Sequence, residues 1–461
     1  MDAMLDCIIR HGCTVTEQGA RRLDVAIKDG VIVGLGEAGA FAQAREIIDA
    51  AGMYVLPGMI DAHAHLAKTQ GSFPSMDNYE NATIAAAFGG TTSFIDFAFP
   101  YGQDTPQSAL ESKLQQARGH CYVDYSFHTN LTQADPVHYA QIEELIQSGF
   151  PSVKMFTIYR GGRMLEKAGI YEMMQRIARH NGITMVHAES AEMIERYIAD
   201  AAQKGTTSPC DHAVCRPPVS ELEAMYGVLA LARQTGAPTI FAHVTIGQCE
   251  QMLREARANT PVFAEVCPHY LVLDESVYRR EDACKFVCSP PIRAKEQREG
   301  LWRMVQSGLV DIVNSDTTDF SIEQKRRFET FFPKMPNGLP TLETRGIVLF
   351  SEGVARGRIS IERFVELTST KNAKLMGMYP QKGVLRVGSD ADIVVLDPHA
   401  HQILSADASH MQTDYSPYEG MEVTGKVLHT LVRGHWIIRD GAFTGTGFRG
   451  TLIRRASPIL S

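Results

Sequence analysis

The chain has 461 residues and a formal net charge of −8, with 44% hydrophobic and 21% charged residues. It is too long for one ordinary small domain and suits a large barrel with an accessory domain, and its composition predicts a well-buried globular core. The acidic balance argues against a nucleic-acid partner as the main function.

Nine scattered cysteines, an odd number, do not form the pattern of a disulfide framework. The first six residues, Met1 to Asp6, contain no basic segment followed by an apolar run, so no signal peptide is expected. No run reaches the ~18 apolar residues of a membrane span. We therefore expect a cytoplasmic protein with no membrane partner.

Both ends of the chain are rich in short strands separated by Gly, Asp and Thr. Strand-like runs occur at residues 5–9, 23–27, 31–33, 391–396 and 427–432. A β-rich piece at each end can join into one small domain. We therefore expect residues 1–53 and 379–461 to form a β-sandwich domain beside a barrel.

The segment 54–378 alternates short β-rich runs with longer helical ones, such as 171–179 and 221–229, and a last helical region is expected at 361–378. Eight strands are predicted, at residues 54–65, 91–97, 121–128, 152–157, 183–188, 239–244, 261–267 and 310–315. Eight β/α units over roughly 300 residues predict an α/β fold, a (β/α)8 TIM barrel, in which catalytic groups lie at the C-terminal ends of the strands.

Gly34, Gly36 and Gly39 match the GxGxxG spacing of dinucleotide-binding loops and follow the strand-like run at 31–33. A nucleotide site requires a complete βαβ unit, whereas here the chain leads directly into a histidine pair. We therefore interpret these glycines as turns in the small β domain.

An Asp-Ala-His-Ala-His run ends the first predicted barrel strand. Asp61, His63 and His65 are spaced two apart, so strand alternation predicts that their side chains share one face. Two imidazoles and a carboxylate at a strand end suit zinc or a similar divalent ion. For this motif alone, the alternative is a pair of strand histidines hydrogen-bonded to local backbone.

Four other predicted strands each contribute one side chain that suits a metal centre, within the strand or at its end. These side chains are Lys154, His187, His243 and Asp316. Taken singly, each is explained by a satisfied core group or by a lysine whose amine reaches solvent. Their convergence at successive strand ends instead predicts one metal centre at the mouth of the barrel.

Lys154 requires a chemical change to act as a metal ligand, because a lysine amine is a poor ligand for a hard cation. Carbamylation by CO2 would convert the amine into an oxygen donor that can bridge two ions. Two close ions share and acidify one water, which then attacks a polarised carbonyl.

The chain resembles the amidohydrolase superfamily and, within it, the dihydropyrimidinase/D-hydantoinase (phenylhydantoinase-like) family. The resemblance covers nearly the whole chain. The matching motifs are PGMIDAHAH at 57–65, KMFTIY at 154–159, VHAE at 186–189, CPHY at 267–270, SPP at 289–291, PNGLP at 336–340 and GSDADI at 388–393. The first of the finer motifs is weak alone, but together they are highly specific.

The resemblance implies two divalent metal ions, expected to be zinc, and a CO2-derived carbamate on Lys154. One ion would be held by His63, His65, the carbamylated lysine and Asp316. The second would be held by the same lysine, His187 and His243.

The resemblance also implies roles in catalysis. Asp316 would take a proton from the attacking water and pass it to the leaving ring nitrogen. Tyr159 would donate a hydrogen bond to the tetrahedral oxyanion. Ser289 and Asn337 would bind the imide or amide edge of the substrate, and plain turns are the alternative for both.

Leu66 and Phe156 flank the predicted site and would line an apolar lid over the exocyclic substituent of the ring, with simple barrel packing as the alternative. In this family the strand-8 aspartate is usually followed by His and Cys, whereas here Thr317 and Thr318 follow it. Asp316 itself is kept, so metal binding and proton transfer are still expected, while the choice of substrate stays open.

We therefore predict a binuclear metal-dependent cyclic amidohydrolase that opens dihydropyrimidine or 5-substituted hydantoin rings to N-carbamoyl amino acids. Its partner would be a small cyclic amide or ureide, and the resemblance implies a homotetramer. One alternative is an allantoinase or dihydroorotase-like activity. A dihydroorotase would need basic groups for the substrate carboxylate, and the apolar Leu66 and Phe156 argue against it. Another is a non-catalytic dihydropyrimidinase-related scaffold, against which the complete set of ligand positions argues.

Overall fold

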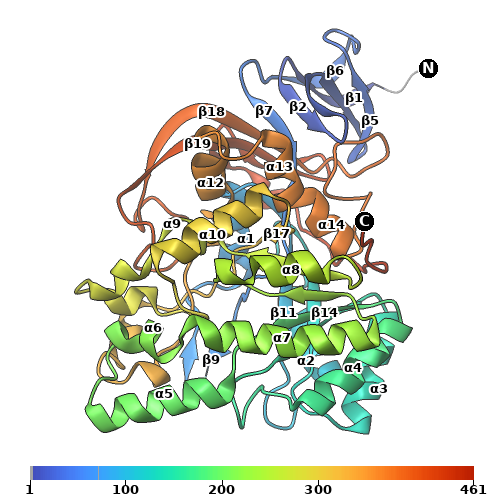
Figure 1. Cartoon of the computed structure of the whole chain (residues 1–461). Coiled ribbons are helices and arrows are strands. Elements are labelled where there is room, and N and C mark those ends of the chain that lie inside the picture. The colour runs from blue at the N-terminus through green and yellow to red at the C-terminus, as the bar shows by residue number, and fades with distance from the viewer. Residues whose placement is uncertain (1–3, 71) are drawn as a thin grey trace.

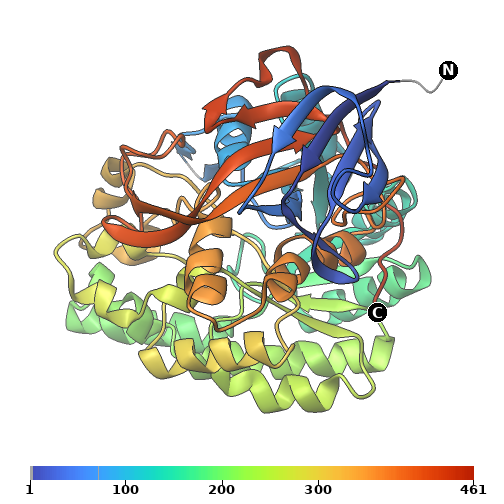
Figure 2. The same ribbon diagram turned by 90° about the horizontal axis from the view of Figure 1, so that it is seen from above.

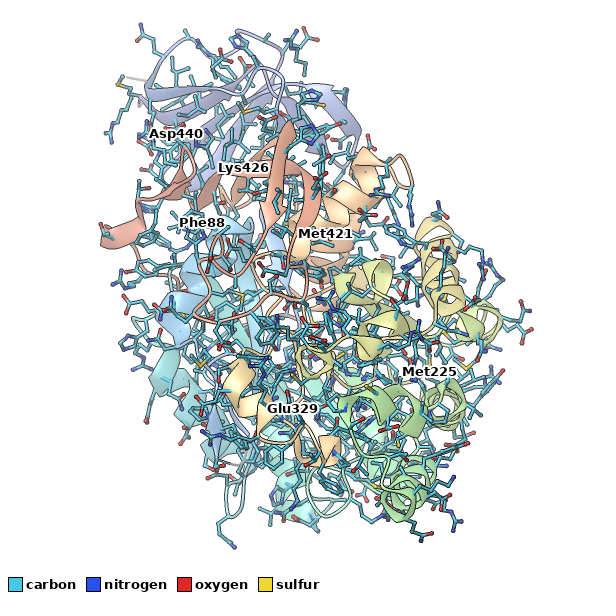
Figure 3. The ribbon with its side chains drawn as sticks, turned by 90° about the vertical axis from the view of Figure 1, so that its left-hand side faces the viewer. Phe88, Met225, Glu329, Met421, Lys426 and Asp440 are labelled. Carbon is cyan, nitrogen blue, oxygen red and sulfur yellow. The ribbon has the colours of Figure 1, made fainter. Side chains whose placement is uncertain are left out.

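The computed structural model describes residues 4–70 and 72–461, so residues 1–3 of the segment considered for a signal peptide lie outside it. A barrel surrounded by helices forms one end of the molecule, and strands from both chain ends form the other (Figure 1). In the side view, Met225 and Glu329 mark the barrel end, and Lys426 and Asp440 mark the end with the sheets (Figure 3).

Within the described chain, eight parallel strands follow one another around the barrel in sequence order. They are β8 (Met59–Asp61), β11 (Thr91–Ala98), β12 (Asp124–Asn130), β13 (Ser152–Phe156), β14 (Ile183–His187), β15 (Thr239–Phe241), β16 (Val262–Val266) and β17 (Ile312–Val313). The first and last strands meet just beyond their ends, where the Asp316 N–H donates to the His63 carbonyl at 2.8 Å and the His65 N–H donates to the Thr317 carbonyl at 3.1 Å. The predicted TIM barrel is confirmed.

The prediction of one continuous strand over 54–65 is wrong, because the run divides at Gly58. β7 (Tyr54–Pro57) pairs with strands of the β-sandwich, and only β8 belongs to the barrel. A Cβ at Gly58 would lie 2.1 Å from the Thr92 hydroxyl oxygen, so this close approach requires glycine. Since β8 ends at Asp61, the histidines that follow lie beyond the regular strand.

Strands from both chain ends build the predicted β-sandwich, and the view from above has the blue N-terminal strands beside the orange and red C-terminal ones (Figure 2). One sheet has the order β5 (Val31–Gly36), β4 (Asp24–Lys28), β1 (Leu5–Arg10), β6 (Ala44–Asp49). The other has the order β21 (Ala442–Phe443), β20 (His435–Arg439), β19 (Met421–Val432), β18 (Ile393–Leu404), β7, β2 (Cys13–Thr16), β3 (Gly19–Arg22). Apolar side chains of both sheets, including Ile9, Val25, Val55, Ile393 and Leu431, form one buried cluster.

Helices follow the barrel strands, most of them on the outside of the barrel, and some of the later ones also pack against strands of the β-sandwich. They are α1 (Tyr79–Phe88), α2 (Pro106–Ala117), α3 (Pro136–Gln147), α4 (Lys167–Arg179), α5 (Ala191–Lys204), α6 (His212–Cys215), α7 (Pro218–Thr235), α8 (Glu250–Ala256), α9 (Pro268–Val272), α10 (Lys295–Gln306), α11 (Ile322–Arg326), α12 (Arg345–Leu349), α13 (Ile361–Val365) and α14 (Lys371–Leu375). Several begin at clear sequence signals, such as Asp135, whose carboxylate accepts the N–H groups of Val137 and His138 before α3. Within the described residues, no helix is both long and apolar enough to span a membrane.

Shorter elements complete the chain. The helical region expected over 361–378 consists of α13 and α14, which are joined by a π-helical turn, η7 (Glu366–Thr370). A second π turn is η6 (Phe350–Ala355), and a hairpin of β9 (Thr69–Gln70) and β10 (Phe73–Pro74) follows the first barrel strand. The 3-10 turns are η1 (Pro209–Asp211), η2 (Gly247–Cys249), η3 (Glu275–Arg279), η4 (Ala283–Phe286), η5 (Phe332–Lys334) and η8 (Gly445–Gly447).

The GxGxxG segment belongs to the β-sandwich, and β6 follows it rather than a helix. Gly39 is in a turn with φ of 84°, in agreement with the interpretation from sequence. Gly34 and Gly36 lie within β5, where a Cβ would approach Phe41 and Ala40 to 2.5 Å and 2.6 Å. The interpretation as turns is therefore wrong for these two glycines, which are explained by close packing of the loop onto the strand.

Candidate active site

A cavity of about 260 Å³ lies where the C-terminal ends of the barrel strands converge. It is lined by His63, His65, Lys68, Lys154, Phe156, Tyr159, Gly162, Arg163, His187, His243, Cys288, Ser289, Asp316, Thr318, Asn337 and Gly338. The six predicted metal ligands, which span more than half of the chain in sequence, are therefore brought to one cavity.

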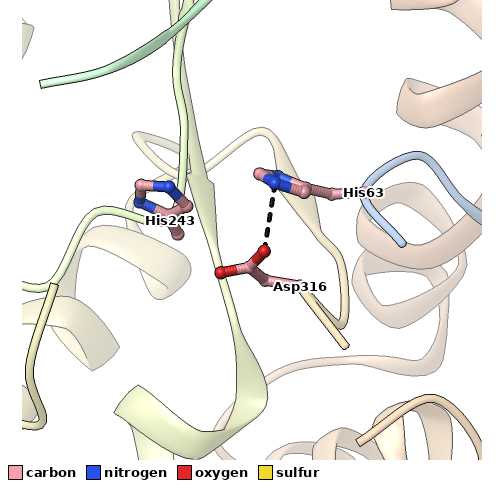
Figure 4. Close-up of side chains that lie close together, drawn as sticks. All are labelled: His63, His243 and Asp316. Carbon is pink, nitrogen blue, oxygen red and sulfur yellow. Dashed lines mark ion pairs between the residues drawn. The ribbon is translucent and has the colours of Figure 1, made fainter. Parts of the chain in front are cut away.

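Asp316 lies close to the imidazoles of three histidines. One of its carboxylate oxygens, Oδ1, is 3.1 Å from Nε2 of His63 and 3.2 Å from Nε2 of His65. Ligand atoms of His63, His243 and Asp316 all lie within 4.8 Å of one another, and these side chains face a common point in Figure 4. Although burial alone raises the pKa of Asp316, the neighbouring histidines hold it well below its usual value. Three nitrogen donors around one carboxylate form a donor set suited to a divalent cation.

Lys154 has a buried amine, which lies 5.4 Å from the centre of the Phe97 ring and 5.3 Å from that of Phe156. The side chain is 1% exposed, and Nζ has no hydrogen-bond partner among the described residues. Burial lowers the pKa of Lys154 to about 8. A buried and unsatisfied amine costs free energy, so this group requires a further partner in the cavity.

Two buried carboxylates that were not predicted from the sequence orient the histidines. Glu265 Oε2 accepts from Nδ1 of His63 at 2.6 Å and from the backbone N–H of His243 at 3.0 Å, and its Oε1 accepts from the Asn314 side chain at 2.7 Å. These bonds leave Nε2 of His63 free to face the cavity. A carboxylate behind a ligating histidine fixes its tautomer and increases its basicity.

Glu189 has the same function for His187, whose Nε2 lies 2.6 Å from Glu189 Oε2. Arg216 donates to the same oxygen at 2.7 Å. Burial alone raises the pKa of Glu189, but the charges of Arg216 and His187 lower it to about 2. The carboxylate therefore stays ionised and occupies Nε2 of His187, which leaves the other ring nitrogen, Nδ1, for the cavity.

Asp61 does not line the cavity, so the expectation that it shares a face with the two histidines is wrong. Its Oδ1 accepts from the N–H groups of His63 and Ser315 at 3.3 Å and 3.1 Å, and its Oδ2 is 3.7 Å from Nε of the fully buried Arg345. The strand ends at Asp61, and strand alternation therefore no longer applies to the residues after it.

Three non-glycine residues of the cavity have a left-handed backbone. Their φ values are 73° for Tyr159, 38° for His243 and 48° for Asp316. This conformation is strained for residues other than glycine, and such strain persists where the surrounding structure enforces a functional geometry. Each of the three lies just past a barrel strand, where the chain turns its side chain into the cavity.

Ser289 and Asn337 also line the cavity, as does Tyr159. The Ser289 hydroxyl donates to Asn337 Oδ1 at 2.9 Å, and the Asn337 amide donates to the Met335 carbonyl at 3.0 Å. The bond between Ser289 and Asn337 joins two loops that are far apart in the sequence, and both side chains lie at the same cavity.

Phe156 lines the cavity as expected, but Leu66 does not. Leu66 packs with Ala64 in a buried cluster that includes side chains of α1 and α2. Its N–H donates to Asp96 at 3.2 Å and its carbonyl accepts from Lys113 at 2.6 Å, which fixes this orientation. The prediction that Leu66 lines a lid over the substrate is therefore wrong.

Lys68 and Arg163 take part in lining the cavity, and neither was predicted. Both lie in loops after strands that carry metal-ligand candidates, and this position is the only sequence signal that points to them. Thr318 also lines the cavity, whereas Thr317 is buried beneath it, where its hydroxyl accepts the Thr341 N–H at 3.2 Å. Of the two departures from the family pattern, Thr318 is the one in a position to contact a bound molecule.

Comparison with known proteins places these observations in a family. Residues 54–437 match the model of the amidohydrolase family. A D-hydantoinase of Geobacillus stearothermophilus is 37% identical over 97% of this chain and 96% of its own length, and a D-phenylhydantoinase of Escherichia coli O1:K1 is 38% identical over 97% and 98%. The crystal structure of a dihydropyrimidinase from Brevibacillus agri NCHU1002 superposes with a TM-score of 0.95 at 37% identity, covering 98% of this chain and 99% of that one.

Proposed function

Since this chain belongs to the amidohydrolase family and is a hydrolase of cyclic amides, we propose that it opens dihydropyrimidine or 5-substituted hydantoin rings to N-carbamoyl amino acids. One observation carries the proposal: four histidines, a buried lysine and an aspartate from five strand ends line a single cavity in a chain whose relatives are hydantoinases along nearly their whole length. A binding or scaffold protein has no need for such a set.

We propose that two divalent ions, most simply zinc, are held by His63, His65, Lys154, His187, His243 and Asp316. The donor set supports this proposal because it combines imidazole nitrogens with a carboxylate. The unsatisfied amine of Lys154 supports a carbamate there, since an amine with a pKa near 8 is partly neutral and able to add CO2 at neutral pH. When bound, the ions would supply the Lewis acidity that activates water and polarises the scissile carbonyl.

Side chains of the protein would carry out proton transfer, oxyanion stabilisation and substrate binding. Asp316 is held ionised beside the histidines and would accept the proton of the attacking water, then deliver it to the leaving ring nitrogen. Tyr159 would donate its phenolic hydrogen to the oxygen of the former carbonyl as negative charge develops there. The Ser289 and Asn337 loops would bind the amide edge of the ring through backbone groups.

Three broader features belong to the same proposal. Exposed apolar side chains on α5, α6 and α7, namely Tyr197, Val214, Val219 and Tyr226, support a homotetramer. Free and mostly buried thiols are typical of the reducing cytoplasm. We also retain the division into residues 54–378 and residues 1–53 with 379–461, although the pairing of β7 favours a first boundary at Gly58.

The test combines metal analysis with ring opening. We expect about two metal ions per chain by plasma mass spectrometry, and release of N-carbamoyl products from dihydrouracil and 5-phenylhydantoin by liquid chromatography. Lys154→Ala is expected to fold, to lose bound metal and to lose activity. Hydrolysis of only allantoin or dihydroorotate would contradict the proposed ring specificity, and full activity of Lys154→Ala would contradict the bridging lysine.

A further inference from the structure

Two cationic side chains, Lys68 and Arg163, line the same cavity as the metal-ligand candidates. Lys68 lies three residues after His65, and Arg163 lies four residues after Tyr159. Each therefore belongs to a loop that also carries a residue assigned above to the reaction. Arg163 lies beside Phe156, which was expected to line a lid over the exocyclic substituent.

The backbone of Lys68 is held by a pair of hydrogen bonds that leaves its side chain directed to the cavity. Its N–H donates to the Ser75 hydroxyl at 3.1 Å, and its carbonyl accepts from the Ser75 N–H at 2.7 Å. The ammonium group has three donors. Among the residues that the structure describes, no carboxylate lies within ion-pair distance of this group.

Arg163 is fixed in orientation by aromatic rings. Its guanidinium carbon lies 4.5 Å from the centre of the Phe99 ring and 5.8 Å from that of Phe156, and one N–H group donates to the Tyr101 hydroxyl at 3.3 Å. Stacking on aromatic faces holds the plane of the guanidinium in place. The other donors of this group have no acceptor within residues 4–70 and 72–461.

The carboxylates nearest to this cationic pair are already engaged elsewhere. Asp96 accepts from the Tyr79 hydroxyl at 2.6 Å and from Lys113 at 2.9 Å, and Asp316 faces the histidines. Burial lowers the pKa of Lys68 to about 7, and the charge of Arg163 contributes to the same shift. An anion between the two cations would relieve this repulsion.

We propose that the substrate of this enzyme carries a carboxylate on the exocyclic substituent of its cyclic amide ring, and that Lys68 and Arg163 bind this carboxylate. The inference rests on the proposed ring-opening function and specifies its substrate class. Arg163 offers a planar set of donors suited to a carboxylate, and Lys68 adds a second charge to the same cavity from the loop after β8. The two residues determine specificity and take no part in the bond cleavage.

The test uses a matched pair of substrates that differ only in charge, hydantoin-5-acetic acid and its primary amide. We expect kcat/KM for the acid to exceed that for the amide by roughly 10- to 100-fold, the range for hydrogen bonds to charged groups. Because the contact is made away from the reacting carbonyl, it is present before and during bond cleavage. Most of the difference is therefore expected in KM rather than in kcat.

Lys68→Met and Arg163→Met are each expected to reduce the acid-to-amide ratio of kcat/KM by about tenfold or more. Arg160→Met is the matched control, since Arg160 belongs to the same loop as Arg163 but pairs at the surface with Glu195 at 3.2 Å. The control is expected to keep the wild-type ratio. Circular dichroism and metal content verify that each variant is folded and loaded.

The outcomes separate this inference from the proposed function. If the amide and 5-phenylhydantoin are opened but the acid has no advantage, or if both variants keep the wild-type ratio, the carboxylate site is wrong and the ring-opening function stands. If no ring is opened by the metal-loaded enzyme, both are overturned. A preference for the acid that disappears in both variants supports both.

Discussion

Glu265 provides a direct test of how the metal-ligand candidates are held. It lies on β16 at the interior of the barrel, with no exposed surface, and its two carboxylate oxygens accept from His63, His243 and Asn314. Glu265→Gln keeps the shape of the side chain but replaces one oxygen by an NH2 group. Whichever way the amide points, that NH2 group faces at least one of the three donors.

The magnitude follows from this count of hydrogen bonds. One buried donor left without an acceptor costs about 1–3 kcal/mol of unfolding free energy in the metal-free protein. The His63 imidazole also loses the charge that orients it, which is expected to weaken metal binding by roughly 10- to 100-fold. That factor corresponds to about 1.4–2.7 kcal/mol of binding free energy.

The assay is competition for metal with a chromophoric chelator, together with urea unfolding of the metal-free protein. Glu221→Gln is the matched control, because Glu221 is also buried and accepts from the Thr245 N–H at 2.8 Å and from Arg293 at 3.0 Å, away from the cavity. We expect a similar loss of stability in the control and unchanged metal affinity. The reasoning is refuted if Glu265→Gln binds metal as tightly as the wild type while losing stability as Glu221→Gln does.

Two further predictions concern single side chains of the cavity. Tyr159→Phe is expected to lower kcat by roughly 10²- to 10³-fold at unchanged metal content, because one donor to the developing oxyanion is removed. A rise in KM with unchanged kcat, measured by steady-state kinetics, would exclude that role. In the metal-free protein, Lys154 has a folded pKa of about 8 against 10.5 when unfolded, so the unfolded chain binds more protons between these values and stability rises with pH across this window. Below pH 8 the charge on the buried amine costs about 3 kcal/mol of folding free energy, so Lys154→Met is expected to be more stable than the metal-free wild type. This advantage is expected to disappear by pH 10.5. Parallel curves of stability against pH for the two proteins, from denaturant unfolding, would disprove the lowered pKa of Lys154.

Local patterns in the sequence determined much of the architecture. The eight strands were predicted from short apolar runs between helical segments, since each strand of a parallel barrel is buried on both faces. Fold class and the positions of the six metal-ligand candidates followed from this alternation, because parallel strands bring all their C-terminal ends to one side. Glu265 is likewise a charged residue within an apolar strand, β16, so the sequence also contained a signal for this buried carboxylate.

Contacts between distant segments decided the remainder. The close approach of Thr92 divides the strand at Gly58, and hydrogen bonds from Asp96 and Lys113 turn Leu66 away from the cavity. Loop geometry alone brings Lys68 and Arg163 to the same space, although 94 other residues separate them in the chain. Sequence periodicity describes only the neighbours of a residue within one element, whereas the direction of a loop side chain depends on partners supplied by the folded barrel. For this protein the sequence therefore determined the barrel and the positions of its metal-ligand candidates, and the tertiary structure alone decided which charged side chains line the cavity.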